Sequence, residues 1–119
     1  MNYQKIYDAL VQKRRENPLD KKIQYSEKHH IVPQSNGGGN DKENLINLTA
    51  REHFFAHELL VKIYEYKCGK SSKEYINMTY ALFRMSNHKN TSPDNMHGSR
   101  RYERLRLIFI ENQRMMSLG

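Results

Sequence analysis

Residues 1–15 carry apolar side chains at the spacing of an α-helix. Apolar residues recur three or four positions apart, at Tyr3, Ile6, Tyr7, Leu10 and Val11. Positions with this spacing share one face of a helix, which predicts an N-terminal helix within residues 1–20 whose apolar face packs inward. The segment lacks the uninterrupted apolar core of a secretory signal, so we expect a cytoplasmic protein that is not secreted.

Two short strands joined by a loop are predicted next. Residues 25–32 mix aromatic and β-branched side chains and stop at Pro33, which has no backbone donor. Residues 34–42 contain three consecutive glycines flanked by Asn and Asp, which favours tight turns. The apolar run at residues 45–48 then returns as a second strand, so the sequence predicts a hairpin with a long loop.

Helices are predicted for most of the remaining chain. Thr49 and Glu52 form a capping box that starts a helix running from Ala50 to about Tyr66, ended by Gly69. Its inward-facing residues are expected to be Ala56, Leu59, Leu60 and Ile63.

A second capping box at residues 71–74 introduces a helix to about Ser86. Its apolar stripe consists of Tyr75, Met78, Leu82 and Met85. A loop over residues 87–98 precedes a last helix, capped by Ser99, with apolar residues at Tyr102, Leu105, Phe109 and Met116. At 119 residues we expect one α+β domain that is mainly helical.

Histidines are concentrated in one part of this pattern. Four of the six lie between residues 27 and 57: the doublet His29-His30, then His53 and His57. Residues i and i+4 share one face of a helix, so His53 and His57 can direct two imidazoles at one metal ion. Adjacent strand residues project to opposite faces, so one member of the doublet can ligate the metal while the other moves protons.

These residues resemble a known nuclease motif. The matching positions are Glu27 to Pro33, Gly37-Gly38, Asn40, Asn44-Leu45, Leu48-Thr49 and Arg51 to His57. They are similar to the ββα-metal core, also called the His-Me finger, of HNH endonucleases, and most similar to the phage-type homing endonucleases. The resemblance implies a ββα-metal core over residues 24–66, with an N-terminal helix before it. The two further helices within residues 71–119 would then be available for DNA contacts.

The resemblance also implies site roles and products. His29, His53 and His57 would hold one divalent metal ion, and His30 would act as general base on the attacking water. Asn44 would tie down the loop between the strands and so fix the orientation of the base. The expected reaction is hydrolysis of DNA, leaving a 5′-phosphate and a 3′-hydroxyl.

Metal identity stays open because many HNH sequences have Asp where this chain has His29. Three imidazoles suit Zn²⁺, Ni²⁺, Co²⁺ or Mn²⁺ better than Mg²⁺, which prefers oxygen ligands, although water and phosphate oxygens can complete a Mg²⁺ site. Glu27 could support the metal site through a hydrogen bond or could be an exposed strand carboxylate. Arg51 could contact a substrate phosphate or lie on the helix surface.

The charge of the chain indicates the class of partner, and its cysteine content limits the possible metal ligands. Lys and Arg total 20 against 13 Asp and Glu, a net charge of +7, which favours a polyanionic partner. Beside a hydrolytic histidine cluster we expect double-stranded DNA, and no apolar run is long enough to cross a membrane. The single Cys68 excludes a cysteine-based zinc site, so any metal must use His, Asp or Glu.

Two other functions remain open from the sequence. The first is a non-catalytic, zinc-stabilised module that binds nucleic acid, although three ligands leave an open position typical of catalytic sites. The second is a basic interaction domain whose histidines are incidental. The sequence leaves the oligomeric state undetermined.

Overall fold

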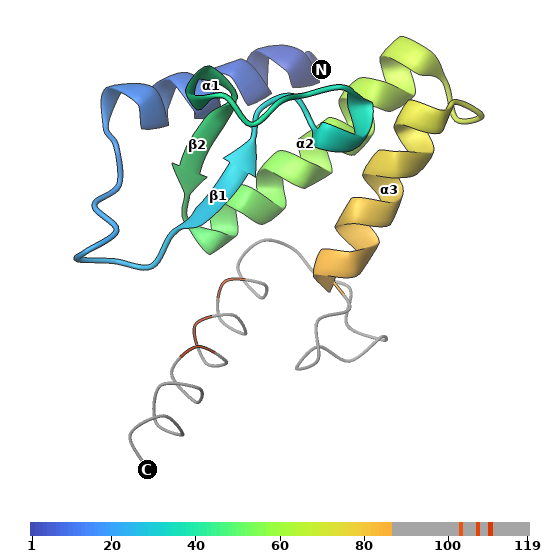
Figure 1. Ribbon diagram of the computed structural model, residues 1–119. Helices are drawn as coiled ribbons and strands as arrows, with labels where there is room; N and C mark the ends of the chain where they lie inside the picture. Colours follow the sequence, from blue (N-terminus) through green and yellow to red (C-terminus); the bar gives the residue numbers. More distant parts are fainter. Residues whose placement is uncertain (87–102, 104–106, 108–109, 111–119) are drawn as a thin grey trace.

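The structure is a computed structural model that describes residues 1–86, 103, 107 and 110. Figure 1 shows the order of its elements: α1 (Tyr3–Glu16), β1 (Glu27–His30), the short 3₁₀ turns η1 (Gln34–Asn36) and η2 (Lys42–Asn44), β2 (Leu45–Leu48), α2 (Ala50–Cys68) and α3 (Lys73–Ser86). The predicted α+β, mainly helical class is confirmed. The predicted loop over residues 87–98, with His88 and His97, lies outside the described residues, as does most of the last predicted helix, of which positions 103, 107 and 110 are helical.

The N-terminal helix α1 agrees with the predicted apolar face. Asn2 caps it, because its side chain accepts a hydrogen bond from the backbone N–H of Lys5 at 3.0 Å. Tyr7 and Val11 are buried, while Tyr3, Ile6 and Leu10 are partly buried against the core.

Strands β1 and β2 form an antiparallel hairpin in which Glu27 pairs with Leu48 and His30 with Leu45. The prediction of a strand over residues 25–32 was too long. Strand β2 has only four residues, since it starts after the Asn44 turn and ends at the Thr49 cap, so β1 can pair over only four. Beyond His30 the backbone bends and its N–H groups bond to Asn44 instead of continuing the ladder.

Helix α2 begins at Ala50 and is ended by Gly69 as predicted, although it continues to Cys68, two residues beyond the predicted Tyr66. Thr49 accepts from the backbone N–H of Glu52, whose side chain accepts in return from the Thr49 N–H, and Gly69 follows the last turn at a positive φ of 85°. The second predicted capping box was displaced by one residue. Ser72, rather than Ser71, accepts from the N–H of Tyr75, so position three of α3 is Tyr75 and not Glu74.

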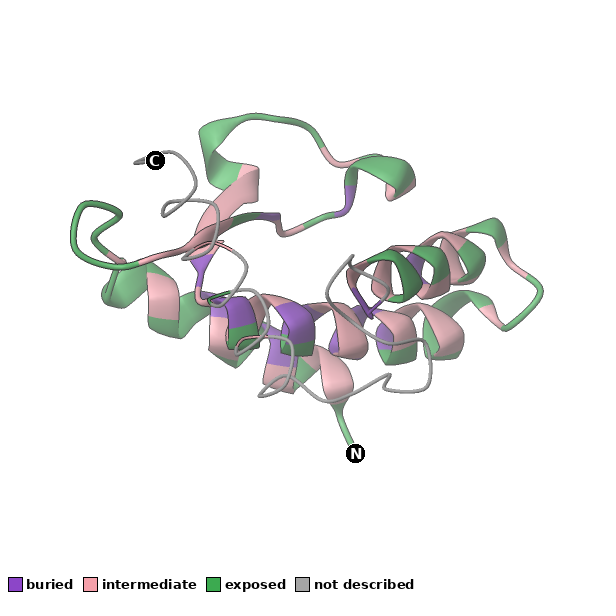
Figure 2. Ribbon diagram, turned by 90° about the horizontal axis from the view of Figure 1, so that it is seen from below, coloured by how far each residue is buried: buried purple, intermediate pink, exposed green. Residues whose placement is uncertain are grey.

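The hydrophobic core surrounds α2. The helix contacts α1, the hairpin and α3, and its predicted inward residues are all buried together with Leu48 and Met78. Figure 2 shows buried positions gathered on the helices and exposed positions on the connecting loops. Within the described residues, no helix is both long and apolar enough to span a membrane.

Candidate metal centre

The pleat of β1 sorts its four residues between two faces. Glu27 and His29 face α2, whereas Lys28 and His30 face outward, as alternation along a strand requires. His29 is consequently only 1% exposed, and it is one of the three largest side chains that are fully buried. A histidine placed this deep needs partners for both of its ring nitrogens.

Three histidine side chains meet where β1 lies against α2. The ring centroids of His29 lie 5.2 Å from those of His53 and of His57, and the latter two are 4.9 Å apart. One nitrogen from each ring can be chosen so that all three lie within 4.8 Å of one another. The structure therefore brings together the three residues that the sequence singled out as ligands.

Hydrogen bonds leave ligand nitrogens available in this cluster. The Nε2 atom of His29 is 2.7 Å from the Tyr7 hydroxyl, which itself donates to the carbonyl oxygen of Ile31 at 2.7 Å. His29 therefore donates from Nε2, and its Nδ1 carries the lone pair. That Nδ1 and the Nδ1 of His57 are buried and have no hydrogen-bond partner within the described chain. Two buried, unpaired imidazole nitrogens in one cluster fit a divalent metal ion.

The third ring is oriented by a carboxylate. The Nδ1 of His53 lies 2.7 Å from Oε1 of Glu27, in a contact where both side chains are largely buried. A histidine that donates to a carboxylate from one nitrogen presents the lone pair of the other to a metal. Of the two interpretations of Glu27, the structure thus favours support of the site over an exposed strand carboxylate.

Burial keeps two of these rings neutral. Desolvation, followed by the neighbouring His57, His53 and His30, lowers the pKa of His29 to about 2. Desolvation also lowers the pKa of His57 to about 3, with His53 and Arg84 acting in the same direction and Glu27 against them. Metal ligation requires neutral imidazole, so protons do not compete for these two rings near neutral pH.

His30, on the outward face, has a different environment. Its Nε2 lies 2.8 Å from Oδ1 of Asn40, an oxygen that also accepts from the side-chain amide of Gln34 at 3.0 Å. Because this oxygen is an acceptor, His30 donates from Nε2 and its Nδ1 is the basic nitrogen of the neutral ring. Asn40 was quoted within the motif, but its contact with His30 was not predicted.

Asn44 fastens the loop between the strands. Its side-chain oxygen accepts from the N–H of Val32 at 2.8 Å, and its amide group donates to the carbonyls of Val32 and Gly39, each at 2.9 Å. One side chain thereby joins the end of β1 to the glycine-rich loop. Its effect on the orientation of His30 stays a prediction.

The histidines open into a cleft of about 320 Å³ between the hairpin and α3. His29, His30, His53 and His57 all line it, and Lys28 and Arg84 supply two cationic side chains. Arg84 was not predicted, although its spacing from Met78 and Ala81 on α3 would place it on the same side of the helix. Arg51 does not line the cleft among the described residues, and it forms an ion pair with Glu103 at 3.0 Å.

Helix α1 supports both elements that carry the cluster. Tyr7 contacts the end of β1, as described above, and Arg14 forms a two-pronged ion pair with Glu52, the residue before His53. The two side chains are 16% and 14% exposed, so the pair is largely shielded from water. Neither long-range contact follows from the helical spacing of α1 alone.

Comparisons with known proteins agree with this geometry. Residues 16–51 match the model of the HNH endonuclease family, a range that contains Glu27, His29, His30 and Asn44. The chain is 47% identical over 92 residues to "Probable mobile endonuclease E" of Enterobacteria phage T4, covering 76% of this chain and 57% of that protein. It is 54% identical over 66 residues to "Probable mobile endonuclease D" of the same phage, covering 54% of this chain and 26% of that protein.

A more distant relative is the "Uncharacterized 38.5 kDa protein in psbA intron 1" of Chlamydomonas moewusii, 37% identical over 73 residues that cover 61% of this chain and 21% of that protein. The chain thus spans between about a fifth and somewhat more than half of the length of these relatives. No solved structure matches it significantly. Motif, histidine geometry and relatives together show that the chain contains an HNH endonuclease-like region and is similar to mobile endonucleases of phage T4.

Proposed function

We propose that this protein is a metal-dependent DNA endonuclease that hydrolyses phosphodiester bonds in double-stranded DNA in the cytoplasm. His29, His53 and His57 would hold one divalent ion, and His30 would be the general base. The observation that carries the proposal is the convergence of three buried or half-buried imidazoles, two with unpaired nitrogens, in the same cleft as His30.

The four histidines of the cleft divide the chemistry between a metal site and a general base. A bound divalent ion would act as a Lewis acid on the phosphate and stabilise charge on the leaving oxygen. His30, held through Nε2 by Asn40, accepts a proton at Nδ1 from the attacking water. The water oxygen forms a bond to phosphorus while the bond to the 3′-oxygen breaks, and that oxygen takes a proton from solvent. The products are a 5′-phosphate and a 3′-hydroxyl.

Positive side chains in the cleft complement this chemistry. Lys28 and Arg84 come from β1 and α3, so they flank the histidines from two elements. Their charges attract the phosphate and stabilise the negative charge that grows on it during hydrolysis. Asn44 acts less directly, since it holds the loop that carries Asn40.

The proposal is tested by cleavage of supercoiled plasmid with Zn²⁺, Mn²⁺, Ni²⁺, Co²⁺ or Mg²⁺ added separately to chelator-treated protein. We expect cleavage with at least one ion and none in excess chelator. His30→Ala should reduce the rate at least ~100-fold, the usual contribution of a general base, while metal affinity is retained. Tyr66→Phe is a matched control, because this ring is 91% exposed and lies outside the cleft.

Two outcomes would contradict parts of the proposal. Equal cleavage rates for His30→Ala and the unsubstituted protein would remove His30 from its role. Tight metal binding without cleavage by any of the ions would instead support the zinc-stabilised binding module.

A further inference from the structure

A second hollow lies on the outer face of the hairpin, beside the metal cleft. Its volume is about 320 Å³. We call it the lysine hollow, and its polar lining residues are Lys21, Lys28, Asn40, Lys42 and Asn47. Of its three lysines, only Lys28 has a role assigned above, the attraction of the phosphate in the metal cleft.

The lysine hollow adjoins the reaction site through one shared residue, Lys28, and through one hydrogen bond, between Asn40 and His30. Lys28 lines both the hollow and the metal cleft, and Asn40 lines the hollow while its side chain holds His30. Lys28 also pairs with Asn47 across the hairpin and lies two positions before His30, on the same outward face. The proposed general base therefore stands at the junction of the two hollows.

The side chains that line the lysine hollow carry positive charge and form no ion pair within the described residues. Among the described residues that line it, three are lysines and none is acidic. All three lysines are exposed, and within the described part of the chain none has a carboxylate oxygen within 4.0 Å of its ammonium group. In contrast, Lys62 towards the end of α2 and Lys70 just after it both lie near Glu65, at 4.0 and 3.7 Å.

We propose that the lysine hollow binds the backbone phosphates next to the scissile one, so that the substrate strand leaves the metal cleft over Lys28. The inference rests on the proposed endonuclease function and adds the path of the substrate to it. A DNA strand carries one phosphate per ~3.4 Å of helix axis, so phosphates adjacent to a bond held near His30 reach a neighbouring hollow. Lysine contacts to phosphate position a strand without reading its sequence.

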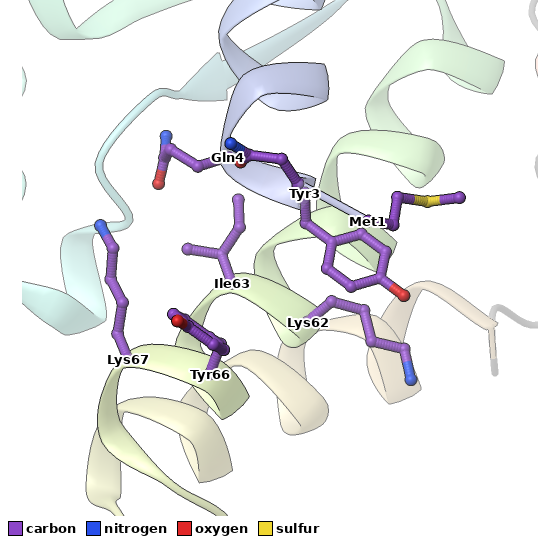
Figure 3. A pocket seen from close by; sticks show the side chains of 8 residues that line it. Met1, Tyr3, Gln4, Lys62, Ile63, Tyr66 and Lys67 are labelled. Carbon is purple, nitrogen blue, oxygen red and sulfur yellow. The ribbon is translucent and has the colours of Figure 1, made fainter.

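The test compares two double variants that remove the same charge. Lys21→Gln with Lys42→Gln removes two of the three lysine charges of the lysine hollow. Lys28 stays unchanged because it also lines the metal cleft. The control is Lys62→Gln with Lys67→Gln, whose lysines flank a different cavity of about 520 Å³ between the start of α1 and the end of α2 (Figure 3). Binding to a duplex DNA fragment is measured at several salt concentrations in excess chelator, so that no cleavage occurs.

Each phosphate contact contributes about 0.9 to the slope of log affinity against log salt concentration. We expect the Lys21/Lys42 variant to lose roughly 1.8 of this slope and to bind at least ~10-fold more weakly at 0.1 M salt. Its Zn²⁺ affinity should be unchanged, and the control variant should change the slope and DNA affinity much less.

Equal losses in the two variants would show a diffuse charge effect and overturn the inference, as would no loss in either. Failure of the unsubstituted protein to cleave with any ion would remove the proposed function, a result independent of the two binding slopes. If the unsubstituted protein cleaved DNA and the Lys21/Lys42 variant bound it with unchanged affinity and salt dependence, the endonuclease function would stand and only the role of the lysine hollow would be disproved.

Discussion

In two histidines of the cluster, a hydrogen bond at one ring nitrogen fixes the tautomer and thereby leaves the lone pair of the other nitrogen for a metal ion. Nε2 of His29 is hydrogen-bonded to the Tyr7 hydroxyl, and Nδ1 of His53 is hydrogen-bonded to the Glu27 carboxylate. Burial, with smaller effects from Tyr64 and Asp8, raises the pKa of Tyr7, so its hydroxyl keeps its proton and donates to Ile31. Partners of this kind fix the tautomer of a ligand and reduce the ordering that metal binding requires.

The first prediction concerns the hydroxyl of Tyr7. Tyr7→Phe removes only this group, so the ring still fills its place in the core. We expect Zn²⁺ and Co²⁺ affinity to fall by roughly 10- to 100-fold, because Nε2 of His29 loses its partner and the ring its fixed orientation. The free energy of unfolding without metal should fall by only about 1 to 2 kcal/mol. Competition with a chromophoric chelator measures the affinity, and urea unfolding measures the stability.

Tyr66→Phe is the control for this change, because the Tyr66 ring is 91% exposed and far from β1 in sequence. If Tyr7→Phe lowered stability yet left metal affinity equal to that of the control, Tyr7 would be a core residue without influence on the metal centre.

Single positions differ in how far the sequence could predict them. His53 and His57 were predictable because both lie on one helix, where a spacing of four fixes their relation. Tyr7 was predicted only as part of an apolar face, since periodicity reports which side of a helix is buried and not which distant atom its hydroxyl reaches. Arg84 was also missed because it depends on distant contacts. The cleft that Arg84 lines is formed where the hairpin loop packs against α3, and helical periodicity does not report such a contact.

At the scale of elements, the glycine-rich loop determines where His30 stands. The side-chain amide of Asn44 donates to the carbonyls of Val32 and Gly39. Gly38 lies close to both the Val32 carbonyl and the Asn44 amide, and there is no room for a side chain at this position. A Cβ atom at Gly38 would lie 1.8 Å from the carbonyl oxygen of Val32 and 2.9 Å from the amide nitrogen of Asn44. Neither neighbour is a freely moving side-chain end.

The second prediction compares two adjacent glycines. Gly38→Ala should lower the free energy of unfolding by about 2 kcal/mol or more, since backbone must move, and should lower the cleavage rate as the loop displaces Asn40. Gly39→Ala is the control, because its Cβ would approach only the carboxylate of Asp41, at 2.7 Å, which can rotate away. Thermal or urea unfolding and plasmid cleavage measure the two effects. Equal tolerance of both alanines would show that the loop is not fixed at Gly38.

The elements themselves were largely predictable, and their lengths less so. The Thr49 capping box and Gly69 set the ends of α2 by local hydrogen bonds that depend on a few neighbouring residues. The length of β1 depends on its partner, which has four residues, so the β-forming side chains of Tyr25, Ile31 and Val32 could not extend the ladder. The residue that caps α3 is Ser72 rather than Ser71, and the Ser72 hydroxyl also donates to the carbonyl of Gly69, at the end of α2.

At the scale of the whole molecule, the metal centre imposes a cost on folding without metal. His29 and His57 are held neutral, with pKa values lowered to about 2 and about 3, whereas histidine in an unfolded chain titrates near ~6.5. Below pH ~6.5 the unfolded chain therefore binds protons that the folded chain excludes. The free energy of unfolding consequently falls as pH falls from about 6.5 towards the folded-state values.

The third prediction concerns this fall in the free energy of unfolding at lower pH. In metal-free protein each of these histidines contributes a slope of up to ~1.4 kcal/mol per pH unit, and most of the change between pH 6 and 5 should come from this pair. His57→Gln should remove about half of the slope. The difference between the two proteins isolates the histidine, because the raised pKa of Glu58 and the lowered pKa of Glu52 affect both alike. Urea unfolding in chelator at pH 7.5, 6 and 5 measures it, and parallel curves for both proteins would mean that His57 is accessible to protons in the folded chain.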